Sequence, residues 1–222
     1  MKYYIDAGAN IGTTLDLFFT KYPDPEGFNI ILFECNPDLI PTLKDSVVRT
    51  RSRISVNSHK WVTSELKRDF FNAGQGTIKE EAVWIRDGEV DFYLDKKGRS
   101  SLGSTLIKEK QTGHLDLKNP EKVKCIDFSK YILANFSKDD YIVLKMDIEG
   151  SEWEVLEKMM NDGSIDYIDE LCGEWHIENI KKTRAEWEEI KLKLKSHNKE
   201  LVHMGARTEL DSWTWPNKAN ND

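Results

Sequence analysis

The sequence predicts an α/β fold, with a doubly wound, mostly parallel sheet and helices on both of its faces. Apolar runs alternate along the chain with segments whose apolar residues recur at helical spacing. The runs Phe28–Phe33 and Tyr141–Leu144 are apolar almost throughout, which is typical of central parallel strands covered on both sides. A glycine-rich turn over Gly8–Gly12 follows the first run. Strands and helices that alternate in this way form α/β domains around one sheet.

The first part of the chain predicts two strand–helix units. Tyr3–Ile5 forms a short strand, and apolar residues within Leu15–Tyr22 follow helical spacing until Pro23 ends the helix. The strand Phe28–Phe33 is followed by a second amphipathic helix over Leu39–Val47. Two consecutive units of this kind favour a parallel arrangement of their strands.

The middle of the chain is less regular. Arg49–Thr77 mixes scattered apolar residues with polar ones and predicts only helix and loop. Ala82–Ile85 and Val90–Leu94 flank Asp87-Gly88, a dipeptide typical of tight turns, so we expect a β-hairpin there. Asp95–Glu121 carries few apolar residues. A loop of that length in a compact domain is usually a lid, a binding loop or a disordered segment.

Regular alternation resumes after this loop. The predicted elements are a strand over Val123–Ile126, a helix containing Tyr131 and Phe136, a strand over Tyr141–Leu144, a helix over Trp153–Met160, a strand within Ile165–Trp175, a helix over Trp187–Leu194 and a short strand over Leu201–Met204. With the first two units they predict one domain over residues 1–222.

Composition restricts the class of protein. The 222 residues carry a formal net charge of −7 and 39% of them are hydrophobic, which fits a globular protein and argues against a surface that binds nucleic-acid phosphates. Cys35, Cys125 and Cys172 form no C-x-x-C pair, so neither a zinc site nor a disulfide framework is indicated. No apolar run approaches the ~20 residues of a membrane span. We therefore expect a soluble, cytoplasmic protein that binds no nucleic acid.

The glycine-rich turn and an acid at the end of the second strand indicate a nucleotide-type cofactor site. Gly8, Asn10 and Gly12 lie in the turn, and Glu34 follows 22 residues after Gly12. Backbone amides of such a turn can approach a ligand, and an acid about 20 residues further on can hold ribose hydroxyls. Asp6 would repel a pyrophosphate but attract a cation, which favours S-adenosylmethionine over NAD. Alternatively, the glycines serve only positive φ angles or tight packing.

Polar residues at the ends of predicted strands indicate one site. The carboxyl ends of parallel strands meet at one edge of a sheet, where ligands bind. We therefore expect five such residues to converge: Asp6, Glu34, Asp147, Glu174 and His176. Asp147 could instead cap the following helix. Glu149 and Glu152 fit that stabilising role better, because we place them within the first turn of the helix.

Glu174 and His176 are candidates for the chemistry of the site. On an extended segment their side chains share one face, so they can orient each other or jointly hold a metal ion or a hydroxyl. We take His176, assisted by Glu174, as the first candidate for a general base and Asp147 as the second. A divalent ion bound by Asp147 and this pair is an alternative that the sequence does not require. His176 could also be an ordinary hydrogen-bonded surface histidine. Trp213 and Trp215 could stack on a sugar.

Five motifs in chain order resemble those of the FkbM-type methyltransferases. The resemblance covers Tyr3–Leu156, and the last motif is the most specific. The motifs are Asp6-Ala7-Gly8-Ala9-Asn10-Ile11-Gly12, Phe33-Glu34-Cys35-Asn36-Pro37, Glu81-Ala82-Val83 before the expected hairpin, Ser100-Ser101-Leu102, and Leu144-Lys145-Met146-Asp147-Ile148-Glu149-Gly150-Ser151-Glu152.

The resemblance implies a Rossmann-like class I methyltransferase fold and an S-adenosylmethionine-dependent O-methyltransferase. It further implies a sugar hydroxyl as acceptor, for which a deoxyhexose in a glycan is our expectation. The roles implied by matching position are contact with the methionine end of the cofactor for Asp6, Gly8 and Gly12, contact with the ribose for Glu34, flanking of the adenine for Glu81 and Ala82, and proximity to the methyl group for Asp147.

The chain departs from the family pattern at its start. Many relatives carry helices before the first motif that help to close the site, whereas this chain begins almost at its first strand. This departure favours a domain taken from a longer polypeptide, with neighbouring domains as partners. The acceptor pocket would then depend on Asp95–Glu121 and on the C-terminal tail.

Two other functions fit the same architecture. One is an NAD-dependent sugar oxidoreductase or epimerase, which Asp6 disfavours through its charge. The other is a non-enzymatic glycan-binding module that kept the fold and lost turnover. Equilibrium binding of NAD against S-adenosylmethionine separates the first from a methyltransferase, and transfer of a labelled methyl group separates the second.

Overall fold

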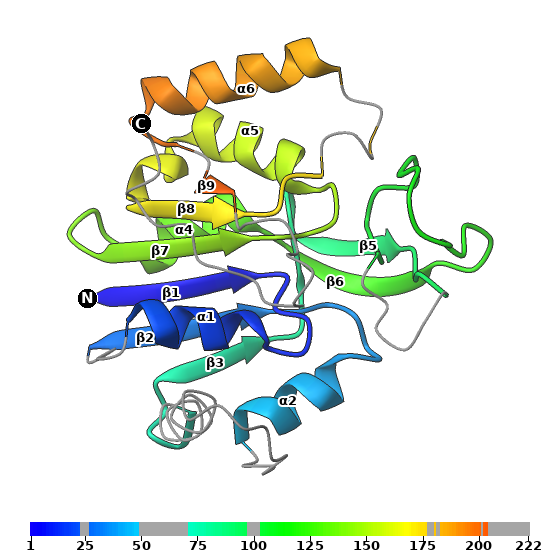
Figure 1. Ribbon diagram of the computed structural model, residues 1–222, viewed down its shortest axis with the longest axis horizontal. Helices are drawn as coiled ribbons and strands as arrows, with labels where there is room; N and C mark the ends of the chain where they lie inside the picture. Colours follow the sequence, from blue (N-terminus) through cyan, green and yellow to red (C-terminus); the bar gives the residue numbers. More distant parts are fainter. Residues whose placement is uncertain are drawn as a thin grey trace.

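The computed structural model describes residues 1–22, 27–48, 71–96, 103–176, 180, 183–200 and 202–203. Its central feature is a six-stranded sheet in which every neighbouring pair of strands is parallel (Figure 1). In spatial order the strands are β3 (Gly76–Lys79), β2 (Phe28–Phe33), β1 (Lys2–Ala7), β7 (Tyr141–Met146), β8 (Glu170–Gly173) and β9 (Val202–His203).

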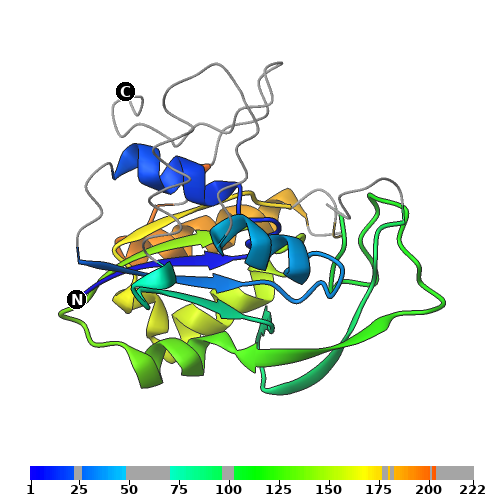
Figure 2. The same ribbon diagram turned by 90° about the horizontal axis from the view of Figure 1, so that it is seen from below.

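Helices cover both faces of this sheet. α1 (Thr14–Lys21) and α2 (Ile40–Val48) lie on one face, and α4 (Phe128–Asn135), α5 (Glu152–Asp162) and α6 (Arg184–Ser196) pack on the other (Figure 2). A short 3₁₀ turn, η1 (Ser164–Tyr167), follows α5 and contacts α4. The predicted doubly wound α/β fold is therefore confirmed.

Alternation along the strands explains why both faces need a cover. In β1, Tyr4 packs with α1 and α2, whereas Ile5 packs with the helices of the opposite face. Leu32 and Phe33 of β2 divide between the faces in the same way. All four side chains are buried. Since burying one such side chain contributes about 1.5–3 kcal/mol, both hydrophobic layers stabilise the sheet.

The helix α5 has a clear stop signal, and at its start the Glu152 side chain, not a Ser151 capping bond, holds the loop before it. Ser151 is its N-cap residue, and Gly163 ends it in the left-handed conformation, with φ of 76°. Trp153, Leu156 and Met159 form its buried stripe. The loop between β7 and α5 is thus held at the carboxyl edge of the sheet.

A second, three-stranded sheet lies beyond that edge. Its order is β4 (Ala82–Trp84), β6 (Glu121–Asp127) and β5 (Gly88–Phe92). β6 pairs parallel with β4 and antiparallel with β5, so that Cys125 has Ala82 on one side and Gly88 on the other. The predicted hairpin is therefore wrong, because β6 lies between its two expected strands.

The turn at Asp87 is bonded to the end of β6 and does not close a hairpin. The Asp87 carboxylate accepts hydrogen bonds from the backbone amide of Asp127 at 3.1 Å and from Lys130 Nζ at 2.9 Å. Both donors come from the end of β6 and the start of α4. The Asp-Gly signal thus marks a real turn, but a distant strand decides the pairing.

Several predictions fall mostly or wholly outside the described residues. Most of Arg49–Thr77 lies outside them, and the prediction of helix and loop is wrong at its end, where β3 begins at Gly76. Ser100–Leu102, Trp213 and Trp215 also lie outside them. Among the helices that the structure describes, none combines the length and apolar character needed to cross a bilayer.

Candidate functional site

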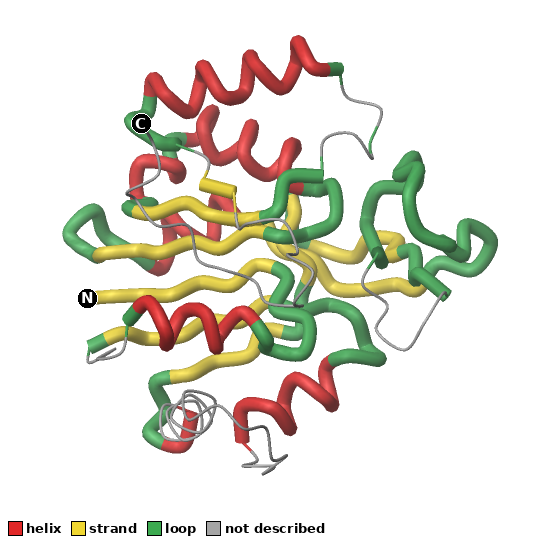
Figure 3. The backbone as a smooth tube through the Cα atoms, viewed as in Figure 1, coloured by secondary structure: helices red, strands yellow, loops and turns green. Residues whose placement is uncertain are grey.

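The loops that follow five strands meet at one edge of the sheet (Figure 3). After four of these strands, the first residue donates a backbone hydrogen bond to the last carbonyl of the neighbouring strand. These bonds are Glu34 N to Lys79 O at 3.0 Å, Gly8 N to Phe33 O at 3.0 Å, Asp147 N to Ala7 O at 3.0 Å and Glu174 N to Met146 O at 3.2 Å. The strand ends thus meet at one edge, as predicted. That the five side chains expected there form one binding site stays a prediction.

The strand order reverses between β1 and β7. From β1 the chain proceeds outward through β2 and β3, whereas β7 is followed by β8 and β9 on the other side. Ligands of open α/β sheets bind at such a switch point. Here the loops are tightly apposed, because a Cβ on Gly8 would lie 1.9 Å from the carbonyl oxygen of Asp147.

The glycine-rich turn uses three positive φ angles. Gly8 and Gly12 have φ of 85° and 82°, and Asn10 has φ of 51°. A Cβ on Gly12 would lie 2.9 Å from Ser46 Oγ and 3.1 Å from Leu43 Cδ1, both on α2. Tight packing, one of the two interpretations that the sequence left open, thus explains both glycines without a ligand. Asn10 takes the left-handed conformation that asparagine tolerates.

Glu34 fastens this turn to the end of β2. Its Oε2 accepts a hydrogen bond from Asn10 N at 2.8 Å, and its Oε1 accepts one from Asn36 N at 2.7 Å. Burial raises the pKa of Glu34, against the effect of these amides, of the Cys35 amide and of Lys145. A carboxylate has about four acceptor positions, so beside three amides one position is left for a ligand hydroxyl.

Asp6 is turned into the protein rather than toward a ligand. Its side chain is 0% exposed, its Oδ1 lies 3.0 Å from Lys145 Nζ, and its Oδ2 accepts a hydrogen bond from Thr14. Lys145 Nζ also donates to the carbonyl of Gly8 at 2.7 Å. The expectation that the Asp6 carboxylate faces a cationic cofactor is therefore wrong, because Lys145 compensates its charge inside the sheet.

Sequence reasoning missed the role of Lys145. It lies opposite Asp6 in the register of β1 and β7, and neighbouring carboxylates, Asp6 first, raise its pKa although burial alone would lower it. A signal was present, because a lysine inside a strand that is otherwise apolar must find a buried partner.

Glu81 and Ala82 lie where the resemblance places the adenine. They follow β3, whose last residue accepts the hydrogen bond from Glu34 N. Ala82 is buried in the second sheet, and Glu81 is partly exposed. In the strand order, Glu81 and Ala82 follow β3, so they lie on the β2–β3 side of β1, opposite to β7. Their contact with adenine stays a prediction.

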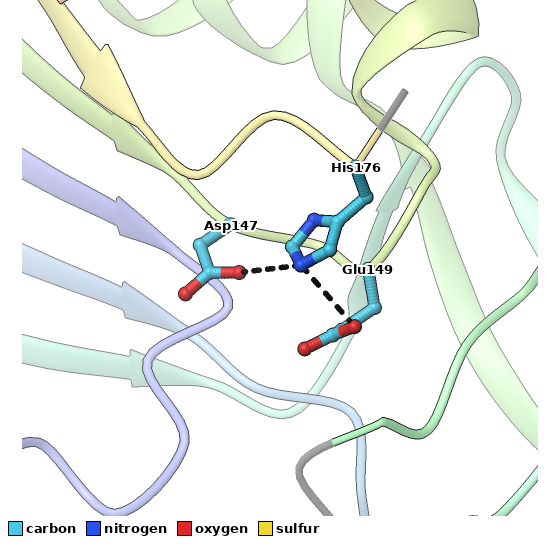
Figure 4. Close-up of side chains that lie close together, drawn as sticks. All are labelled: Asp147, Glu149 and His176. Carbon is cyan, nitrogen blue, oxygen red and sulfur yellow. Dashed lines mark ion pairs between the residues drawn. The ribbon is translucent and has the colours of Figure 1, made fainter. Parts of the chain in front are cut away.

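On the opposite side of the switch point, Asp147, Glu149 and His176 point toward one another (Figure 4). His176 is only 8% exposed, and its Nε2 lies 3.4 Å from Glu149 Oε2 and 4.0 Å from Asp147 Oδ1. One ligand atom from each of the three residues lies within 4.8 Å of the others, a spacing that a metal ion can bridge. We call these three side chains the Asp-Glu-His cluster.

The partner that orients His176 is Glu152, not Glu174. Nδ1 of the ring lies 3.1 Å from Glu152 Oε1, whereas Nε2 lies 3.9 Å from Glu174 Oε1. Desolvation lowers the pKa of His176, but Glu152, Glu149 and Asp147 outweigh it and raise that pKa to about 9. Without a bound cation the imidazole is therefore protonated at neutral pH, which disfavours the predicted role of His176 as a base assisted by Glu174.

Glu149 belongs to the site rather than to the following helix. It precedes α5, has φ of 58°, and pairs with Lys110 as well as facing His176. Burial raises its pKa. The assignment of Glu149 to helix stabilisation is thus wrong. Glu152 does stabilise the start of α5, because it accepts hydrogen bonds from Ile148 N and Gly150 N, each at 2.8 Å.

Part of the long loop closes one side of this cluster. Thr105 Oγ1 donates to the carbonyl of Glu149 at 2.7 Å, and Lys110 Nζ donates to the carbonyl of Gly103 at 3.0 Å and to the Glu149 carboxylate. Within Asp95–Glu121, residues 103–110 thus form a wall beside the site. Its role in acceptor binding stays a prediction.

Comparison with known families identifies the chain. The family described as Methyltransferase FkbM domain matches residues 6–201, a range that contains the glycine-rich turn, Glu34 and the Asp-Glu-His cluster. The chain belongs to the FkbM methyltransferase family. The predicted resemblance is therefore confirmed, and at the level of the family the chain is a methyltransferase. No curated protein and no solved structure matches it.

Proposed function

We propose that this FkbM protein transfers the methyl group of S-adenosylmethionine to a hydroxyl of a sugar, with a deoxyhexose in a glycan as the preferred acceptor. The supporting observation is the switch point itself. It packs a glycine-rich turn, with a ribose-type acid behind it, against the backbone of Asp147, whose side chain belongs to the Asp-Glu-His cluster. Membership of a methyltransferase family supports the interpretation of the turn as a cofactor site and of the cluster as an acceptor site.

The cofactor would lie across β1, β2 and β3. Glu34 would accept hydrogen bonds from the ribose hydroxyls, the turn Gly8–Gly12 would contact the methionine part, and Glu81 with Ala82 would flank the adenine. Asp147, whose backbone carbonyl lies against Gly8, would be near the methyl group. With Asp6 neutralised by Lys145, the carboxylates of the exposed edge would have to attract the sulfonium charge.

The acceptor hydroxyl would approach from the side of the Asp-Glu-His cluster. Its oxygen forms a bond to the methyl carbon while the carbon–sulfur bond breaks, and the electron pair of that bond stays on sulfur. Most of the catalysis comes from alignment of the hydroxyl oxygen, the methyl carbon and the sulfur. A base that takes the hydroxyl proton typically raises the rate a further 10²–10⁴-fold. The base we favour is the carboxylate of Asp147, which is 18% exposed and lies beside His176 at this edge of the sheet.

Nicotinamide-dependent sugar chemistry is less well supported. The Tyr-x-x-x-Lys spacing of the catalytic pair in that class occurs twice, at Tyr93 with Lys97 and at Tyr141 with Lys145. Tyr93 is buried, and both members of the second pair are engaged elsewhere. Tyr141 hydrogen-bonds to Glu170, and Lys145 is paired with Asp6 and is 1% exposed. Neither side chain is available to a substrate at the carboxyl edge.

The decisive experiment is methyl transfer from labelled S-adenosylmethionine to a panel of sugars. We expect one class of sugar to become labelled, and NMR of the product should locate the new O-methyl group. An Asp147→Asn variant should bind the cofactor and turn over slowly. Tight binding of NAD, with none of S-adenosylmethionine, would sink the proposal.

Glu34 offers a separate test of cofactor binding. Glu34→Gln keeps the size of the side chain but weakens its hydrogen bonds to ligand hydroxyls, so calorimetry should show an affinity for S-adenosylmethionine about tenfold lower or more. Glu89→Gln on exposed β5 is the matched control and should bind like the wild type. Equal affinities of the Glu34 variant and the wild type would contradict the ribose assignment.

A further inference from the structure

We propose that Asp147, Glu149 and His176 bind a divalent cation, and that Glu152 is the positioning residue that orients the His176 ring toward it. The binding site is inferred from the geometry of the Asp-Glu-His cluster. Its placement beside the acceptor hydroxyl rests on the proposed function.

The spacing of the three ligand atoms suits a shared ion. His176 Nε2 lies 3.4 Å from Glu149 Oε2 and 4.0 Å from Asp147 Oδ1, and all three atoms lie within 4.8 Å of one another. These separations are too long for hydrogen bonds. Ligands that hold one cation at about 2.0–2.2 Å lie about 3–4 Å apart. A small closing movement would therefore complete the coordination.

The His176 ring has the carboxylate partner on its second nitrogen that is typical of metal-binding histidines. Its Nδ1 faces Glu152 Oε1 at 3.1 Å, and the Glu152 carboxylate is itself fixed by the amides of Ile148 and Gly150 at 2.8 Å each. Histidine ligands almost always donate their second ring N–H to a carboxylate, a carbonyl or water in this way. The arrangement leaves Nε2 as the ligand atom.

Two buried polar atoms aim into the centre of the cluster. His176 is more than nine-tenths buried, and its Nε2 has only long ion-pair contacts with Glu149 at 3.4 Å and with Asp147 at 4.0 Å. Asp147 Oδ1 is buried and accepts no hydrogen bond from the described residues. Contacts this long satisfy buried polar groups poorly, so a closer shared partner is expected. A cation supplies it, and on binding it replaces the proton on Nε2.

The chemistry of the ligands selects the kind of ion. Two carboxylates and one imidazole suit Mn²⁺ and related divalent ions, and the thiolates that favour softer metals are absent from the cluster. Glu149 Oε2 also pairs with Lys110, so the carboxylate would be shared between the ion and an ammonium group. Asp147 and Glu149 remain 18% and 23% exposed, which leaves positions for water or an acceptor hydroxyl.

The test is binding of Mn²⁺ to the full chain without S-adenosylmethionine, measured by calorimetry and by electron paramagnetic resonance. We expect one saturable site per chain in the wild type. Glu149→Gln and His176→Gln should each weaken Mn²⁺ binding at least tenfold. Glu152→Gln removes no ligand but should weaken it about 10–100-fold through loss of ring orientation. Circular dichroism of each variant verifies its folding.

Two carboxylate variants serve as controls. Glu174→Gln and Glu189→Gln should bind Mn²⁺ like the wild type, because the first lies at the rim of the cluster and the second pairs with Lys193 on α6. Absence of saturable binding in the wild type would overturn the inference. So would wild-type affinity in folded Glu149→Gln and His176→Gln variants, or equal losses in Glu174→Gln and Glu149→Gln.

The inference and the proposed function fail in different ways. Mn²⁺ binding with no binding of S-adenosylmethionine would retain the cation site and remove the methyl-transfer role. Methyl transfer that proceeds at full rate without bound metal, together with no Mn²⁺ binding, would retain the function and remove the cation site.

Discussion

At the scale of single residues, the buried pair of Asp6 and Lys145 explains how the glycine-rich turn is held. Lys145 reaches the carboxylate of Asp6 and the carbonyl of Gly8, so one ammonium group joins two neighbouring strands to the turn. Neither side chain is exposed by more than 1%. The pair therefore has a structural role that its position in the first motif conceals.

This role predicts a strong coupling between the two residues. Lys145→Met leaves the Asp6 carboxylate buried without its cation and should lower the free energy of unfolding by about 3–5 kcal/mol. Adding Asp6→Asn to that variant removes the uncompensated charge and should recover part of the loss. Urea unfolding of both single variants and of the double variant measures the coupling as a double-mutant cycle. Strictly additive losses would mean that the two side chains do not interact.

At the scale of elements, a network at the opposite edge of the sheet joins α1 to β7 and β8. Glu170 at the start of β8 accepts hydrogen bonds from Lys21, from Tyr141 and, at 2.9 Å, from Tyr22. Burial raises the pKa of Glu170, but these donors outweigh it and lower that pKa overall. Burial of Tyr141 and its contact with the Glu170 carboxylate raise the pKa of Tyr141 to about 12.

The lowered pKa of Glu170 makes its contribution dependent on pH. Its folded pKa lies below the unfolded value of 4.5, so the stabilisation is fully present above about pH 4.5 and is lost as the pH falls through the folded pKa. Glu170→Gln should therefore lower the free energy of unfolding at pH 7 by about 1.5–3 kcal/mol and by much less at pH 3. Urea unfolding at the two pH values measures the difference.

The control for this variant is Glu188→Gln on α6. Glu188 pairs with Lys191 in an exposed position, so its replacement should leave stability nearly unchanged at both pH values. A Glu170 effect of the same size at pH 3 and pH 7 would show that packing, and not the charge of the carboxylate, carries the contribution.

Local sequence patterns predicted most strands and helices correctly. The hairpin prediction, which failed, depended on pairing between distant strands. Apolar runs and helical spacing depend on neighbours in sequence, and so β1, β2, β7 and the helices after them were found. The hairpin failed because β6, more than 30 residues away, enters between β4 and β5. Pairing of distant strands leaves no mark in a dipeptide at a turn.

The candidate site divides in the same way. The convergence of strand ends follows from parallel topology and was predicted. The contacts within the site depend on loop conformation, in particular the left-handed Glu149 that directs its carboxylate to His176. The pairing of His176 with Glu152 instead of Glu174 likewise arises from how α5 begins. Residue spacing in an extended chain could not show either contact.

At the scale of the whole molecule, the sheet consists of two halves that meet between β1 and β7. One half carries the proposed cofactor contacts and the other carries the Asp-Glu-His cluster. Their apposition requires that the turn after β1 touch the loop after β7, which happens at Gly8 and the Asp147 carbonyl. The distance between the proposed cofactor and acceptor positions would thus be set by a contact at which no side chain fits.

Gly8→Ala tests this apposition. The new Cβ would lie 1.9 Å from the Asp147 carbonyl oxygen, and backbone cannot move aside without separating β1 from β7. We expect a loss of unfolding free energy well above the strain of a positive φ, which costs about 1–2 kcal/mol, and a loss of S-adenosylmethionine binding. Gly163→Ala is the matched control, because Gly163 has φ of 76° and a Cβ added there would meet nothing within 4 Å. Its cost should be that strain alone, with cofactor binding intact.

Urea unfolding and calorimetry measure the losses in the two variants. Equal losses would mean that the positive φ, and not the contact with the Asp147 carbonyl, determines the need for glycine at position 8. In that case the two halves of the sheet would not depend on Gly8 to meet.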